Sequence, residues 1–88
     1  MRPNSTNDAE ALALSALATT LTDERRARRF LDLSGIETDE LRRRAGDPTI
    51  LAALIRFLEA HEPDLIDVAE AIGVSPQQLV AAREELER

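Results

Sequence analysis

The stretch DPTILAALIRFLEAHE, residues 47–62, decides how this chain folds. Apolar or small side chains fill positions 50–58, and one arginine is the only charge among them. A helix with so little polar surface must be covered on several sides, so it is the expected centre of a small bundle. Asp47 is a good N-cap and Pro48 suits the first helical position, which marks where this helix begins. We therefore expect a central helix over about residues 48–61, wrapped by shorter helices that leave little room for a pocket.

Prolines and glycines divide the remaining chain into short helices. Each internal proline stands just inside an expected helix start and each glycine just past an expected end, which is the usual asymmetry of helix termini. The expected helices cover residues 8–21, 23–34, 39–45, 62–72 and 76–86, with Thr22, Thr38 and Ser75 among the N-caps. No stretch alternates with a period of two, so no strand is expected. The fold class is therefore all-α: a compact bundle of five or six short helices in one domain, residues 8–88, behind a disordered tail, residues 1–7.

Helical periodicity assigns a buried face to each helix. In the first helix Leu14, Leu17 and Leu21 follow the spacing of one face, which Leu12, Ala13 and Ala16 widen. The apolar face expected for the second helix consists of Ala27, Phe30, Leu31 and Leu33. The two aromatic residues, Phe30 and Phe57, are expected to pack together in the core between the second helix and the central one.

Length and composition limit the class of protein. Eighty-eight residues, of which 43% are hydrophobic, suffice for one domain with its own core. The chain has no cysteine, which excludes a disulfide framework and thiolate chemistry. No apolar run approaches the roughly 20 residues of a membrane span, and the N-terminal stretch lacks the basic start typical of a signal peptide. We therefore expect a cytoplasmic protein with no membrane partner.

The net charge of −6 is distributed unevenly. Residues 59–88 hold eight acidic residues against two arginines, whereas residues 23–47 hold seven of each sign. The arginines of this middle segment form a candidate surface for an acidic protein segment or a nucleic-acid backbone. The candidate partner-binding residues are Arg25, Arg26, Arg28, Arg29, Arg42 and Arg43. A solvated face of weak ion pairs, each worth about 0.3–0.5 kcal/mol, is the alternative interpretation.

Residues 65–86, LIDVAEAIGVSPQQLVAAREEL, match a helix-turn-helix pattern in which Gly73 provides the turn. Such a motif reads DNA when its second helix presents side chains to base edges and nearby cations contact phosphates. The candidate DNA-reading residues are Ser75, Gln77, Gln78 and Arg83. Glutamates surround them, and an acidic surface loses the phosphate attraction that supplies most non-specific affinity. Two short helices that simply pack through a glycine turn are therefore favoured over a DNA-binding motif.

No motif indicates a catalytic, cofactor or metal site. His61 is the only histidine and no cysteine is present, so a metal beside it would lack a second nitrogen or sulfur ligand. The three glycines are isolated and serve as helix stops, so no phosphate-binding loop is expected. We therefore expect a protein that is not an enzyme and carries no cofactor.

Several segments of the chain resemble those of a small bacterial family. They are EALALSALA (10–18), FLDLSG (30–35), DELRRRAGDP (39–48), ILAALIRFL (50–58) and HEPDL (61–65). From about Ala9 to Leu86 the sequence is similar to the family called domain of unknown function 3572. It departs from that family's expected pattern in having few aromatics and in His61, where an acidic residue is usual. The resemblance implies a compact helical bacterial protein with no assigned activity.

These observations favour a small protein-interaction or regulatory module. Its expected partner surface is the set of arginines in residues 23–47, and the expected partner is another protein or a second copy of the chain. A helix-turn-helix DNA-binding protein that uses residues 65–88 is the alternative, which the acidic C-terminal third disfavours.

Overall fold

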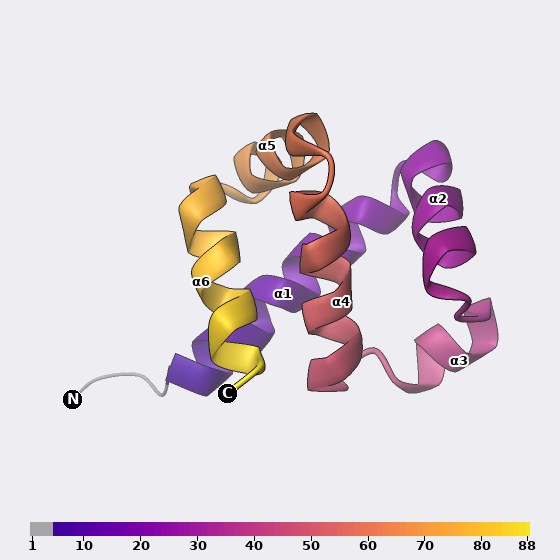
Figure 1. Cartoon of the computed structure of the whole chain (residues 1–88), viewed down its shortest axis with the longest axis horizontal. Helices are drawn as coiled ribbons and strands as arrows, with labels where there is room; N and C mark the ends of the chain where they lie inside the picture. Colours follow the sequence, from indigo (N-terminus) through magenta and orange to yellow (C-terminus); the bar gives the residue numbers. More distant parts are fainter. Residues whose placement is uncertain (1–4) are drawn as a thin grey trace.

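The computed structural model of the chain describes residues 5–88, with side chains described from Asp8 onward. This part of the chain contains six helices and no strand. They are α1 (Ser5–Leu21), α2 (Glu24–Ser34), α3 (Thr38–Arg43), α4 (Pro48–Glu59), α5 (Glu62–Ile72) and α6 (Pro76–Leu86). The all-α bundle is confirmed (Figure 1). Residues 5–7, which the sequence assigns to a tail, already belong to α1, and the tail expected at residues 1–4 lies outside the described residues.

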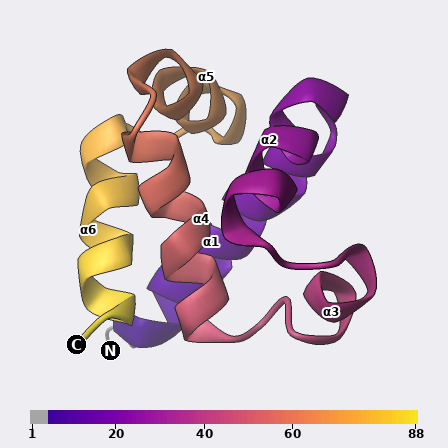
Figure 2. The ribbon, with the colours of Figure 1, turned by 45° about the vertical axis from the view of Figure 1, so that its right-hand side comes forward.

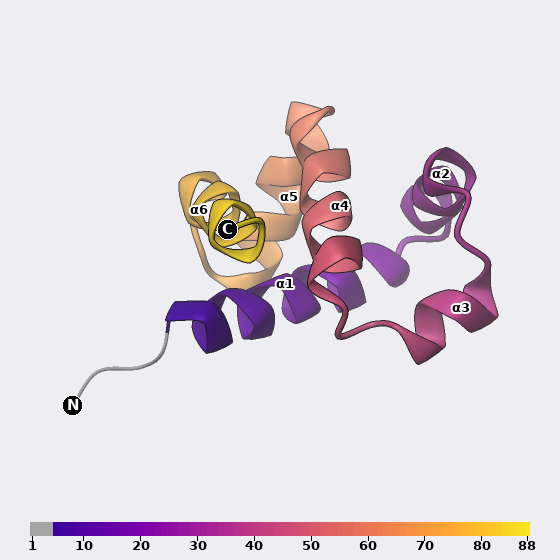
Figure 3. The same cartoon turned by 60° about the horizontal axis from the view of Figure 1, so that its bottom comes forward.

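The apolar helix α4 lies in the middle of the molecule. Figure 1 shows α5 and α6 on one side of it and α2 and α3 on the other, and Figure 3 shows α1 running across beneath it. The side chains that α4 buries completely are Leu51, Leu54, Ile55 and Leu58. The central helix is therefore confirmed. It ends at Glu59, two residues earlier than expected, because Ala60 and His61 turn the chain into α5.

Local capping chemistry explains most helix boundaries. The Asp47 carboxylate accepts a hydrogen bond from the Thr49 amide at 2.8 Å and starts α4 directly before Pro48. Ser75 and Gln78 form a reciprocal capping box that starts α6. Gly73 ends α5 with a φ of +80°, in the left-handed region that glycine adopts without strain. These boundaries agree with the prediction from the sequence.

Two of the expected N-caps are wrong. Asp23, not Thr22, caps α2, because its carboxylate accepts from the Arg26 amide at 3.1 Å while the Thr22 hydroxyl donates back to α1. Thr38 is the first residue of α3, whose N-cap is Glu37 with no side-chain cap. This helix also stops at Arg43 rather than Ala45, and a turn through residues 44–46 leads into α4.

The expected buried face of α1 is correct at Ala13, Ala16 and Leu17 and wrong at Leu14 and Leu21. Its buried residues are Ala9, Ala13, Ala16, Leu17 and Thr20, all within 4% exposure. Leu14 and Leu21 are instead 41% and 39% exposed. Alanines let α4, α5 and α6 approach this helix closely, and all three pack against it. The buried Thr20 hydroxyl donates to the Ala16 carbonyl at 2.8 Å, which leaves the polar atom paired in the core.

Helices α2 and α3 form an arm on the side of α4 away from α6 (Figure 2). Phe30 on α2 is buried and meets Phe57 on α4 edge to face, with ring centroids 5.4 Å apart, so the expected aromatic pair is confirmed. Leu33, assigned to the same apolar face by the sequence, is 77% exposed. The turn of α2 that contains Phe30 therefore packs on α4, while the following turn, which contains Leu33, extends beyond this contact.

Candidate functional site

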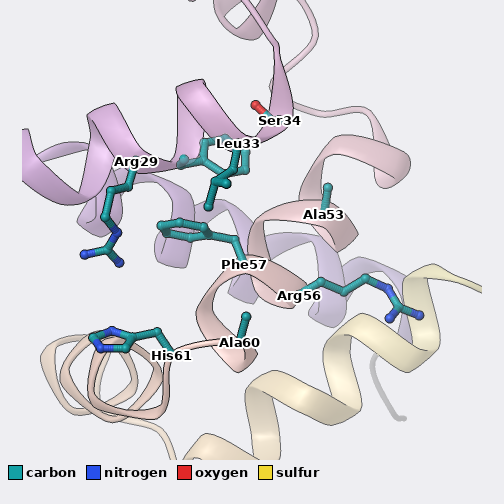
Figure 4. A pocket seen from close by; sticks show the side chains of 9 residues that line it. Arg29, Leu33, Ser34, Ala53, Arg56, Phe57, Ala60 and His61 are labelled. Carbon is teal, nitrogen blue, oxygen red and sulfur yellow. The ribbon is translucent and has the colours of Figure 1, made fainter.

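A groove of about 650 Å³ lies between α2 and α4. Its lining is mostly apolar: Phe30, Leu33, Ala53, Phe57 and Ala60, with Arg29, Ser34, Arg56 and His61 around them (Figure 4). A volume of this size is within the range of binding clefts for small ligands or side chains of a partner. The expectation that the bundle leaves little room for a pocket is therefore wrong.

The groove exists because α4 carries a second apolar face. Ala53, Phe57 and Ala60 recur at spacings of four and three residues, so they line one side of the helix, opposite its fully buried leucines. The two alanine side chains are short, and Phe57 is the side chain of this face that meets α2, through Phe30. The side chain of Leu33 overhangs this face from α2 without covering it.

An arginine stands at each end of the groove (Figure 4). At one end the guanidinium carbon of Arg29 lies 5.3 Å from the centroid of the Phe57 ring, a cation–π contact. At the other end Arg56 holds Glu87 with two hydrogen bonds, from Nε at 2.6 Å and Nη2 at 2.9 Å. The groove therefore has an apolar floor with an arginine at each end, of which Arg56 extends toward α6 and is paired with Glu87 (Figure 4).

A buried carboxylate fixes the Arg29 end. Asp64, in the first turn of α5, is only 4% exposed. Its Oδ1 accepts from Arg26 Nε at 3.0 Å, and its Oδ2 pairs with Arg29 Nη2 and with His61 Nδ1, the latter at 2.9 Å. Burial raises the pKa of Asp64, but the hydrogen bonds from His61 and Arg29 and the charges of the arginines outweigh it and hold this pKa below its ordinary value. Asp64 is therefore ionised and ties α2 to α5.

The arginines predicted as one partner surface divide into two groups. Arg26 and Arg29 turn toward Asp64, so they belong to the contact that holds α2. The other candidates are exposed and form no ion pair within the described part of the chain: Arg25, Arg28, Arg42 and Arg43. The structure therefore brings only Arg29 of the predicted set to the groove.

The residues proposed to read DNA are mostly engaged in the fold. Ser75 and Gln78 cap α6 through each other, so of the two exposed glutamines Gln77 is the one that takes no part in the cap. Arg83 donates to Glu59 at 2.6 and 3.2 Å and to Glu87 at 2.9 Å, and these hydrogen bonds raise its pKa further. A cation already held by two carboxylates contributes little phosphate attraction.

Sequence reasoning missed Asp64 and the role of His61. Asp64 is one of eight acidic residues in its region, and its partners on α2 are 35 and 38 positions away in the chain. The available signal is that Arg26, Arg29 and Phe30 share one face of α2, so this face buries charge together with an aromatic ring. His61, expected at the surface or at a cap, is exposed but also lines the groove.

The described residues contain no cluster of three or more His, Cys, Asp or Glu side chains suited to a metal ion. None of the described helices has the length and apolar character to cross a membrane.

The model of one protein family, described as "Protein of unknown function (DUF3572)", matches residues 6–88. No curated protein and no solved structure matches the chain.

Proposed function

The chain belongs to the DUF3572 family, and we propose that it is a small, non-enzymatic protein-interaction module of the bacterial cytoplasm. In this proposal the groove between α2 and α4 takes an apolar segment of another protein whose flanking residues are acidic.

The apolar groove with a cation at each end is the observation that carries this proposal. Exposed leucines that stand singly on a surface need no explanation, but Leu33 borders a concave face that also exposes part of Phe57. Apolar side chains from a partner would release water from this face, which is the main favourable term in most protein association. An acidic residue beside the apolar segment matches Arg29, whereas Arg56 is already paired with Glu87.

The unpaired arginines add to the charge argument. Arg25 and Arg28 on α2 and Arg42 and Arg43 on α3 belong to the arm that forms one wall of the groove. Residues 23–47 hold as many acidic residues as arginines, so these four side chains offer local contacts to acidic residues of a partner rather than a net positive field. Residues 59–88 carry an excess of six negative charges and repel such segments, which favours the balanced arm as the docking side.

DNA binding through residues 65–88 ranks second. The pattern of two helices around Gly73 supports it, as does the exposed Gln77. The pairing of Arg83 with Glu59 and Glu87 argues against it, because this arginine is the one cation among the candidate reading residues.

Fluorescence anisotropy with a defined probe tests the proposal. The probe is a labelled peptide of about 16 residues, long enough to sample a helix, with two leucines four positions apart and glutamates around them. We expect binding that Leu33→Asp weakens at least about tenfold, because it places a charge on the apolar rim. Ile66→Asp on α5 is the matched control and should leave the affinity unchanged, since Ile66 is an exposed apolar residue outside the groove. Equal binding to both variants, or binding of a labelled DNA duplex in place of the peptide, would overturn the proposal.

A further inference from the structure

The two arginine ends of the groove are not equivalent. Arg56 presents Nε and Nη2 together to Glu87, so one edge of its planar fork is filled by a carboxylate. Arg29 binds Asp64 through Nη2, and its other N–H groups make no hydrogen bond within the described residues. The Arg29 end is therefore the one with donors left for a ligand.

Arg29 is also held in place before any ligand arrives. Its guanidinium is fixed by Asp64 on one side and lies against the Phe57 ring, 5.3 Å from its centroid. Asp64 is itself held by Arg26 and His61, so three donors share one buried carboxylate. A cation fixed in this way loses less conformational entropy on binding than a free surface arginine.

We infer that Arg29 is the carboxylate-recognition residue of the groove, positioned by Asp64, and that it takes a glutamate or aspartate side chain of the partner segment. This inference rests on the proposed function. It adds that the group bound by Arg29 is the side-chain carboxylate of a residue within the partner segment. The inequality of the two ends then sets the direction in which the segment lies.

The geometry also gives the spacing of the partner's residues. The Phe57 ring and the Arg29 guanidinium are close neighbours, with 5.3 Å between ring centroid and guanidinium carbon, so the groups that contact them belong to nearby residues of the partner. Residues three or four apart on a helix are separated by about 5–6 Å. A helical partner segment meets both groups when its acidic residue stands three or four positions from an apolar anchor, on one side of it only.

Isothermal titration of three capped peptides against the full chain tests this inference. All three carry the same pair of leucines; one has glutamate four positions before the pair, one has it four positions after, and the third has glutamine at both places. We expect one glutamate peptide to bind about fivefold to tenfold more tightly than the glutamine peptide, and the other to gain nothing.

Two variants assign that preference to Arg29. Arg29→Gln should abolish it, and Arg29→Lys should reduce it while keeping the charge beside Asp64, which guards against a loss of folding. Arg88→Gln is the control, because Arg88 has a side chain that is 79% exposed and lies outside the groove and outside the candidate arginines, and it should keep the preference.

The outcomes separate this inference from the proposed function. Equal affinity for all three peptides at the groove would overturn the inference and leave the groove as a binding site. Equal gain from glutamate on either side of the leucine pair would overturn the fixed direction of the partner segment. If no peptide binds, the proposed function fails as well.

Discussion

Asp64→Asn tests whether one buried carboxylate holds the α2–α3 arm against the rest of the bundle. The substitution keeps the size of the side chain and removes its charge. Asp64 is 4% exposed and accepts from Arg26, Arg29 and His61, so the variant leaves Arg29 without its counter-charge and Arg26 with the exposed carboxylate of Asp67 alone. Breaking a fully buried ion pair costs about 3–5 kcal/mol.

The expected loss is smaller than that range, because the freed arginines are partly in contact with water. The side chain of Arg26 is 15% exposed and that of Arg29 is 46% exposed, so Arg29 in particular recovers hydration. We expect Asp64→Asn to lower the free energy of unfolding by about 2–3 kcal/mol. For a domain of this size that loss corresponds to a fall in Tm of about 10–20 °C.

Urea unfolding followed by circular dichroism at the helix band measures this change, since the chain has no tryptophan or tyrosine for fluorescence. Asp67→Asn is the matched control. Its carboxylate also reaches Arg26, at 3.4 Å, but the side chain is 63% exposed, so its loss should cost less than about 1 kcal/mol. Equal stabilities of Asp64→Asn and Asp67→Asn would refute the role given to Asp64.

Three further predictions concern pH and packing. Because the pKa of Asp64 in the folded chain is lowered from its ordinary value of 3.8, its contribution is complete above that value and is lost as the pH falls below it. Urea titrations at pH 7 and pH 3 should therefore show a smaller loss of stability in Asp64→Asn than in the wild type, and an equal loss would contradict the pairing. Leu54→Ala removes a fully buried side chain and should cost about 2–5 kcal/mol, whereas Leu33→Ala, at 77% exposure, should stay within about 0.5 kcal/mol in the same assay. Ala16→Leu overfills the close contacts of α1 and should cost about 1–3 kcal/mol, while Ala18→Leu on the exposed side should cost almost nothing; the reverse order in thermal unfolding would contradict the assigned face.

The helix boundaries were the most predictable part of the fold because their signals are local. Asp47 with Pro48, and Ser75 with Pro76, act through hydrogen bonds and a fixed φ within a few residues of each other. Gly73 ends α5 for the same kind of reason. Such signals depend little on what the rest of the chain does.

The buried face of α1 was less predictable because it depends on its neighbours. Its leucines and its alanines both follow helical periodicity, so spacing alone offers two faces. Hydrophobicity favours Leu14 and Leu21, but three helices pack closely on this side of α1, and only the alanine face gives them room.

The candidate site was predictable only in part. The arginines of α2 attract attention from the sequence, but which of them are available depends on Asp64, which lies 35 positions beyond Arg29. From the sequence, Phe57 and Leu33 are predicted to be core residues. They line a groove instead because of where α2 lies relative to α4.

An amide chemical-shift map of the ¹⁵N-labelled chain, titrated with the glutamate-flanked leucine peptide, tests the central claim most directly. If the groove is the binding surface, the shifts at saturation cluster in residues 29–34 and 53–61, on the two walls that line it. No saturable shifts, or shifts confined to residues 75–86 of the helix-turn-helix-like pair, would contradict it.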